Sequence, residues 1–237
     1  MNMISNAATR HLAIGLLAIT CGMCATPNSH AQATQQTWLQ KLRQLIGLSH
    51  PISAGGSRGA GDRVCLISPQ VVQSPDGKAV AVALSSQPTI IAMGTFNEIR
   101  IERGGVLVWR KLATSQAPLV SPLAWPLQPI QPNELVRLQL RPRKASGADF
   151  AELLLQGGSK EAMAQFDAIS QVLDAAPHRM AATVEALMNN NKDNLALQTA
   201  FRSVRTQSDP VLGYLMDGHS ACKGTPIEPI PTAASRR

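Results

Sequence analysis

Short segments in which apolar and polar residues alternate fill the middle of the chain, between residues 64 and 157. In "LVRLQLR", residues 135–141, Val136, Leu138 and Leu140 alternate with polar side chains, which is typical of a strand with one buried and one wet face. Comparable candidate strands cover residues 64–68, 79–84, 89–93, 98–103, 106–111, 135–141 and 150–156. Because segments rich in Gly, Pro and Ser separate them, we expect an immunoglobulin-like antiparallel β-sandwich over residues 64–157.

The segment "NEIRIERGGVLVWRK", residues 97–111, predicts a β-hairpin. Side chains alternate between the faces of a strand, so the length of the loop decides which residues share a face. A three-residue Arg-Gly-Gly loop would set Ile101 opposite Leu107 and Ile99 opposite Trp109, gathering the large apolar groups on one side.

The same register would turn Glu98, Arg100 and Glu102 towards solvent. The two carboxylates are therefore interpreted as part of a solvated charge ladder and not as the acid and base of a glycosidase.

Five prolines interrupt residues 117–134, "APLVSPLAWPLQPIQPNE". Proline removes a backbone donor and favours extended, unpaired chain, so we expect a crossover between sheets. A tryptophan on such a rigid segment is a natural anchor, and Trp125, together with Trp109 on the hairpin, is predicted to bind a partner.

A small helical region is predicted over residues 158–222. Ser159 can cap the first helix, which Pro177 interrupts. Further helices are expected around residues 180–188, from Asp193, and from Asp209-Pro210. Residues 223–237 are predicted to form a disordered tail.

Before the strands, residues 34–63 comprise a short amphipathic helix, over about residues 34–47, and a linker rich in glycine. The helix is expected to dock on the rest of the protein by its apolar side. The linker "SAGGSRGAGD" resembles a phosphate-binding loop, but Asp62 stands where a Walker motif has lysine, and a strand is expected next in place of a helix. No nucleotide is therefore expected to bind there.

Residues 1–33 have the organisation of a secretory signal peptide. Arg10 and His11 precede an uncharged apolar run of about 14 residues, which is shorter than the roughly 20 that span a bilayer, and Ala31-Gln32-Ala33 fits a cleavage site. The chain is predicted to be periplasmic or secreted after cleavage near Ala33. An uncleaved membrane anchor and a lipid-modified cysteine are the alternatives.

Cleavage would remove Cys21 and Cys24 and leave Cys65 and Cys222 as the remaining cysteines. In an oxidising compartment these two are predicted to form a disulfide. The alternative is a metal ion held by His219 and Cys222, although a metal site normally needs three or four ligands. No metal and no cofactor are expected.

Removing residues 1–33 leaves 21 basic and 15 acidic side chains, a net charge of +6. This moderate excess is compatible with an anionic partner, and Arg137, Arg141, Arg143 and Lys144 form a candidate anion-binding strip. The eight aromatic residues are scattered, whereas single-stranded nucleic acid requires aromatic faces along a basic groove. Nucleic acid is therefore not expected as a partner.

The sequence resembles a group of exported cyanobacterial proteins of unknown function. The motifs that carry the resemblance are "GGSRG" before "CLISP", the hairpin segment, "PLAWPLQPIQPNELVRLQLRP" and "GADF". They cover about residues 54–156 and are structural, so the resemblance implies a β-sandwich-like domain and transfers no active residue.

None of His50, His178 and His219 is accompanied by a serine or cysteine nucleophile in a recognised context. We therefore expect a non-catalytic interaction or structural module of the cell envelope with a protein partner. The alternative is a hydrolase or binding protein for an anionic envelope polysaccharide.

Overall fold

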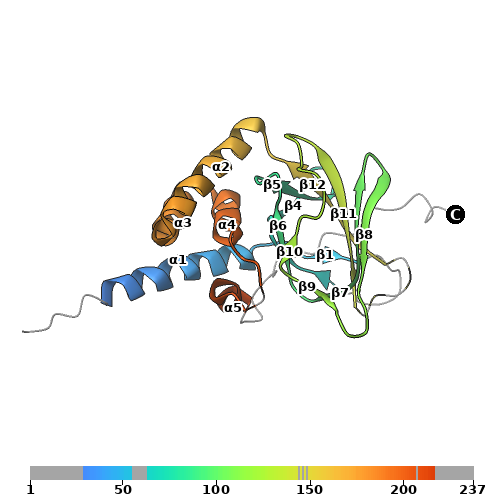
Figure 1. Cartoon of the computed structure of the whole chain (residues 1–237), viewed down its shortest axis with the longest axis horizontal. Helices are drawn as coiled ribbons and strands as arrows, with labels where there is room; N and C mark the ends of the chain where they lie inside the picture. The colour runs from blue at the N-terminus through green and yellow to red at the C-terminus, as the bar shows by residue number, and fades with distance from the viewer. Residues whose placement is uncertain are drawn as a thin grey trace, which may run out of the picture.

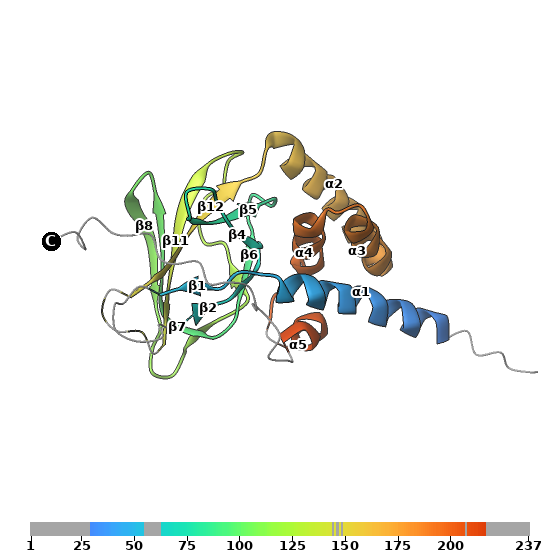
Figure 2. The ribbon, with the colours of Figure 1, turned by 180° about the vertical axis from the view of Figure 1, so that it is seen from behind.

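The computed structural model describes residues 29–54, 63–143, 145, 147, 149–206 and 208–216. Within these ranges the fold is α+β, as predicted, with several mostly antiparallel sheets and a helical region towards the C-terminus. The helices gather at one end of an elongated molecule and the strands at the other (Figures 1 and 2). The predicted signal segment before Ser29, the glycine-rich segment 55–62, Cys222 and the predicted tail lie outside the described residues.

A seven-stranded sheet forms the outer wall of the β region. Its strands are β4 (Val71–Gln73), β5 (Ala79–Ala83), β7 (Thr95–Arg103), β8 (Val106–Leu112), β9 (Leu119–Val120), β11 (Leu135–Pro142) and β12 (Ala151–Gly157). The order is β4-β5-β12-β11-β7-β8, and β9 pairs with β7. All pairs are antiparallel except β5 with β12, so the expectation of a wholly antiparallel domain is wrong at that pair.

A smaller sheet stands between the large sheet and the helices. It has the order β10-β6-β3, formed by β10 (Leu123–Ala124), β6 (Thr89–Ala92) and β3 (Leu66–Ser68). The hydroxyl of Ser121 accepts from the Ala92 N–H and donates to the Ala92 carbonyl, both at 2.7 Å. The proline-rich segment thus pairs with β7 through β9 and with β6 through β10, which confirms the predicted crossover between sheets. A separate two-stranded pair joins β1 (Ile52–Ser53) and β2 (Arg63–Val64).

The helices lie where the sequence predicts them. They are α1 (Ser29–Gly47), α2 (Lys160–Ala175), the 3₁₀ turn η1 (Pro177–Arg179), α3 (Met180–Asn189), α4 (Asp193–Phe201) and α5 (Pro210–Met216). Ser159 caps α2 by accepting from the Ala162 N–H at 3.2 Å, and Asp209 accepts from the Val211 N–H at 2.9 Å. Helix α1 begins before the expected cleavage site at Ala33 and continues through it.

The predicted hairpin loop is wrong by one residue. Gly104 and Gly105 alone form the loop, with φ of 56° and 80°, a left-handed conformation that glycine adopts without steric cost. Ile101 pairs with Trp109 and Glu102 with Leu107, so Val108 is an extra residue in the strand. This β-bulge brings Trp109 to the apolar side although the loop is short.

The first hydrophobic core fills the space between the two sheets. It contains the inward side chains of β7, β11 and β12, and those of Leu66 and Ile90 from the small sheet. The buried face predicted for residues 135–141 is confirmed, because Val136, Leu138 and Leu140 all lie in this core. The wet face is confirmed only in part, because Gln139 on that side is also buried.

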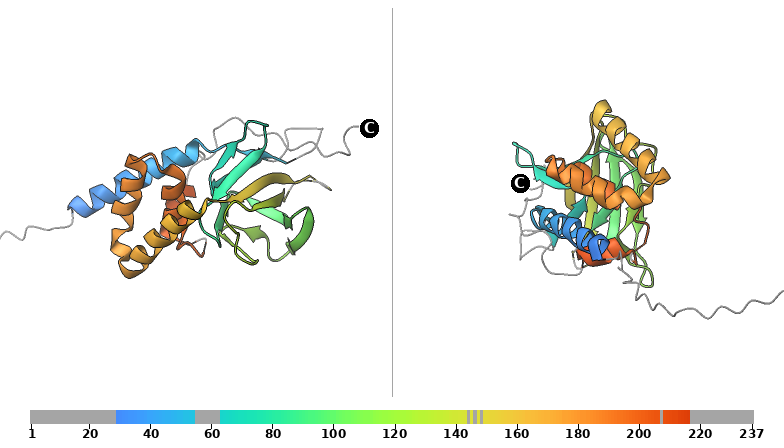
Figure 3. Two further views of the ribbon diagram at one scale, coloured as in Figure 1. Left: turned by 90° about the horizontal axis from the view of Figure 1, so that it is seen from above. Right: turned by 90° about the vertical axis from the view of Figure 1, so that its left-hand side faces the viewer.

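The second hydrophobic core lies on the opposite face of the small sheet. Ile67 and Ile91 point into it and meet apolar side chains from the helices, including Leu42 of α1 and Phe201 of α4. Viewed from the helical end, the helices lie over the strands (Figure 3). The small sheet and the helices therefore share the second core. The docking expected for the N-terminal helix is confirmed.

Buried polar contacts fix α4 to the sheet. Gln198 accepts from the Leu84 N–H at 2.8 Å and donates to the Val82 carbonyl at 2.8 Å. Asn194 donates to the same carbonyl at 3.0 Å. These bonds satisfy backbone groups at the end of β5, which would otherwise be buried without partners.

We predict that Gly157→Ala destabilises the protein by about 3 kcal/mol. A Cβ atom at Gly157 would stand 2.1 Å from the Gln131 carbonyl oxygen, so backbone must move. The matched control is Gly213→Ala in α5, where a Cβ atom meets nothing within 4 Å and stability should be equal or up to about 1 kcal/mol higher. Urea unfolding measures both, and equal stability of the two variants would contradict the packing described for Gly157.

Candidate functional site

Strand β8 is an open edge of the large sheet with exposed apolar side chains. It closes the strand order and pairs with β7 alone among the described strands (Figure 1). Val106, Leu107, Val108 and Leu112 are between 43% and 63% exposed. Proteins usually protect such an edge with charges, bulges or a covering element, because its unpaired N–H and C=O groups invite another strand. Here the bulge at Val108 and the charges of Arg110 and Lys111 protect it in part.

An apolar cleft of about 430 Å³ opens beside this edge. Its wall on the large sheet includes Ile99, Ile101 and Trp109, and its opposite wall is the crossover from Pro118 to Pro126. Lys111 is a cation in a lining that is otherwise almost wholly apolar. Concave apolar surfaces with few polar groups are the usual form of binding sites.

Both predicted partner-binding tryptophans line this cleft. Trp125 is only 9% exposed, and its Nε1 donates to the Gln128 carbonyl at 3.0 Å. Trp109 is half-buried and packs against the first core. The structure thus brings the two residues together, but Trp125 serves as a wall of the cleft and not as a protruding anchor.

The outward face of the same sheet carries a buried carboxylate among three arginines. Glu98 is 1% exposed and bonds to Arg100 Nε at 2.6 Å, Arg110 Nε at 2.5 Å and Arg141 Nη2 at 2.8 Å. The Phe150 ring lies under the guanidinium groups of Arg100 and Arg141, with 4.4 and 5.6 Å between each Cζ and the ring centroid. The expectation that Glu98 faces solvent is wrong, because strands β8 and β11 place arginines over it.

Burial of Glu98 raises its pKa, but hydrogen bonds from Arg110 and Arg100 outweigh this and leave the pKa below its ordinary value. Ionised Glu98 neutralises part of the positive charge of the arginines that surround it. The Glu98 carboxylate therefore links three strands of the sheet. Its pKa is lowered, whereas a carboxyl group that acts as a general acid needs a raised pKa.

The residues of the predicted anion-binding strip are partly committed to such pairs. Arg141 binds Glu98, and Arg137 lies 3.5 Å from Glu102, which is partly buried and not on an open ladder. Arg143 is exposed, and the placement of Lys144 lies outside the described residues. Binding of an anionic polysaccharide by this strip stays a prediction.

Cys65 is buried in the second core and is disulfide-bonded. No other cysteine lies in the described ranges, so the pairing with Cys222 stays a prediction.

Residues 55–59 have the Gly-x-Ser-x-Gly spacing of a hydrolase nucleophile elbow. That elbow joins a strand to a helix. Here the strand β1 precedes the segment and the strand β2 follows it, so the context of Ser57 differs from that of an elbow. The residues 55–62 themselves lie outside the described part of the chain.

Within the described ranges, no cluster of three or more His, Cys, Asp and Glu side chains is arranged to hold a metal ion. None of the helices described combines the length and hydropathy that a membrane span requires.

Comparison with known proteins found no matching family model, no similar curated protein and no similar solved structure. The resemblance to exported cyanobacterial proteins stays a prediction.

We predict that Glu98→Gln destabilises the protein by about 1–3 kcal/mol at neutral pH, because the arginines lose a buried charged acceptor. A carboxyl group whose pKa is lowered by folding stabilises the fold above about pH 4.3, the ordinary glutamate value, and this contribution is lost as pH falls through the folded-state pKa. The variant should therefore show a shallower acid dependence than the parent. Urea unfolding between pH 7 and 3 measures both effects.

Glu102→Gln is the matched control, since its single ion pair is longer and more exposed, and it should cost less than about 1 kcal/mol. Equal stability and equal acid dependence of the parent and Glu98→Gln would contradict the role assigned to Glu98.

Proposed function

We propose that this chain is an exported, non-catalytic module of the cell envelope that binds an extended segment of a partner protein along strand β8. The observation that carries the proposal is the row of exposed apolar side chains on an edge strand that pairs with β7 alone in the described structure. Export rests on the signal-like character of residues 1–33.

Strand addition supplies affinity through the backbone and selectivity through alternate side chains. A strand added beside β8 would satisfy its outward N–H and C=O groups. Alternate side chains of that strand would point towards the cleft beside Trp109, and the others would cover Leu112 and Arg110 on the outward face. The apolar surface of β8 would then be removed from water, which stabilises the complex.

The charge at the edge favours an acidic partner segment. Lys111 lines the cleft, and no ion pair within the described residues involves it. Arg110 is about half exposed beside it. An extended segment with alternating apolar residues and at least one carboxylate near Lys111 would match both the cleft and its charge.

The packing of the small sheet on the large one supports a sandwich-like arrangement as the frame of this module. Within that proposal the immunoglobulin-like topology is a hypothesis, to which the crossover between the sheets lends support.

A photo-cross-linking amino acid at Leu107 tests the proposal in the native host. We expect a discrete cross-linked product with one partner protein, identified by mass spectrometry. The same group at Val172, an equally exposed apolar position on α2, should give no such product. Adding Lys111→Glu to the Leu107 probe should lower the yield several-fold.

No product at position 107, or the same products from both positions, would contradict docking at β8. A cross-linked product that contains two copies of this chain would show that β8 binds a second copy of the chain and not a different protein.

A further inference from the structure

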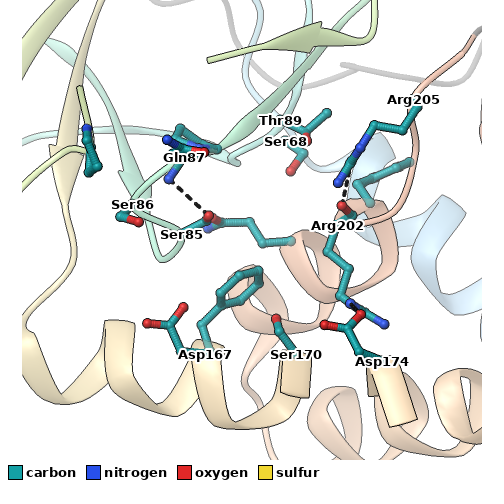
Figure 4. A pocket seen from close by; sticks show the side chains of 15 residues that line it. Ser68, Ser85, Ser86, Gln87, Thr89, Asp167, Ser170, Asp174, Arg202 and Arg205 are labelled. Atoms are coloured by element: carbon teal, nitrogen blue, oxygen red, sulfur yellow. Dashed lines mark hydrogen bonds and ion pairs between the residues drawn. The ribbon is translucent and has the colours of Figure 1, made fainter. Parts of the chain in front are cut away.

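A second cavity, of about 410 Å³, lies where the strands meet the helices (Figure 4). The segment from Ser85 to Thr89, which connects β5 to β6 and includes the first residue of β6, forms one wall. Helix α2 forms the floor in this view, and the end of α4 with Arg202 and Arg205 forms the other side. The volume falls in the range of small-molecule sites.

The walls of this junction cavity are fixed by hydrogen bonds that do not depend on a ligand. Gln198 ties α4 to the end of β5, as described above. The Ile130 N–H donates to the Ser86 carbonyl at 2.8 Å, and the Gln87 N–H donates to the Ser85 hydroxyl at 3.1 Å. The cavity is therefore preformed, which lowers the ordering cost of binding.

Two guanidinium groups face the cavity, and they differ in whether a carboxylate of the protein pairs with them. Arg202 is 12% exposed and bonds to Asp174 at 2.7 Å, so its charge is matched within the protein. Arg205 uses one nitrogen, Nη1, to donate to the carbonyls of Arg202 and Val204 at 2.7 and 3.1 Å. No carboxylate in the described structure pairs with Arg205. Its other N–H groups are thus available to a carboxylate, which matches the planar guanidinium fork.

The remaining polar groups are suited to hydroxyl groups of a ligand. The lining includes the hydroxyl side chains Ser68, Ser86, Thr89 and Ser170, the amide of Gln87 and the carboxylate of Asp167. Asp167 projects from α2 towards the cavity (Figure 4). Ser170 Oγ and Arg202 Nε have no hydrogen-bond partner among the residues that the structure describes. Hydroxyls and amides both donate and accept, and a carboxylate accepts, which is the combination that polyols require.

This composition discriminates between ligand classes. A bare anion could pair with Arg205 but would make no use of Asp167 as an acceptor for hydroxyl groups. An apolar molecule would leave the hydroxyls and Arg205 without partners. A ligand with many hydroxyls and one carboxylate satisfies both sets of groups.

We propose that the junction cavity binds an acidic saccharide, with its carboxylate on Arg205 and its hydroxyls on Asp167 and the serine and threonine side chains. A smaller cavity of about 200 Å³ shares Gln87, Thr89 and Arg205 with it and continues towards Pro122 and Trp125. This neighbour gives room for the next sugar of a chain.

The test is a titration of the full chain with glucuronic acid, glucose and inorganic phosphate, followed by protein NMR shifts. We expect saturable shifts around the cavity, with glucuronic acid binding about tenfold more tightly than glucose, and no saturable binding of phosphate. Arg205→Gln should reduce glucuronic acid to the affinity of glucose, and Asp167→Asn, at an exposed position, should weaken both sugars.

Arg179→Gln, at an exposed arginine on the turn η1, is the matched control and should change neither affinity. Equal binding of glucuronic acid and glucose, tight binding of phosphate, or unchanged affinity in both cavity variants would overturn the proposal. Lys111→Glu should leave sugar binding intact. A failure of the saccharide proposal is therefore distinguishable from a failure of the proposed docking at β8.

Discussion

The small sheet is buried on both of its faces, and both hydrophobic cores depend on it. Leu66 and Ile90 point towards the large sheet, whereas their neighbours Ile67 and Ile91 point towards the helices. Adjacent residues of a strand face opposite sides, so two short strands can serve two cores at once. This layer covers part of the inner face of the large sheet on one side and part of the apolar surface of the helices on the other.

The proposed sites follow from the way this layer is completed. The crossover that adds β10 to the small sheet also forms one wall of the apolar cleft, and the Ser85 to Thr89 segment that leads into β6 forms one wall of the junction cavity. The hydrogen bonds of Gln198 hold α4, which forms one wall of the junction cavity, against the end of β5. At the far side of the large sheet, the order of strands ends at β8 with apolar side chains uncovered. Two clefts and an open edge therefore lie on a frame whose interior is closely packed.

Sequence patterns predicted the longer strands and the helices. The apolar run at residues 79–84 and the alternating residues 135–141 both form strands, and the helices begin at the caps expected from Ser159 and Asp209. Strands β9 and β10 were missed because two residues carry no period. Their positions are set by pairing with β7 and β6, which only the folded chain provides.

The sites were less predictable because distant segments assemble them. Glu98 has the outward orientation expected from its neighbours Ile99 and Ile101, but it is buried by Arg110 and Arg141, which lie on other strands. Trp125 of the apolar cleft was found because a tryptophan in a proline-rich segment is conspicuous, and Trp109 was found on the predicted hairpin. The junction cavity combines Thr89, Asp167 and Arg205 from three separate segments, and no spacing in the sequence indicates it.

Native-state hydrogen exchange on the parent chain and on Ile91→Ala tests most directly whether the small sheet unites strands and helices. Ile91 is fully buried and faces the helices, so truncation should cost about 2–5 kcal/mol. If the layer links both cores, the opening free energies of α4 and β11 should fall by the same amount. Loss of protection in α4 with β11 unchanged would contradict the account.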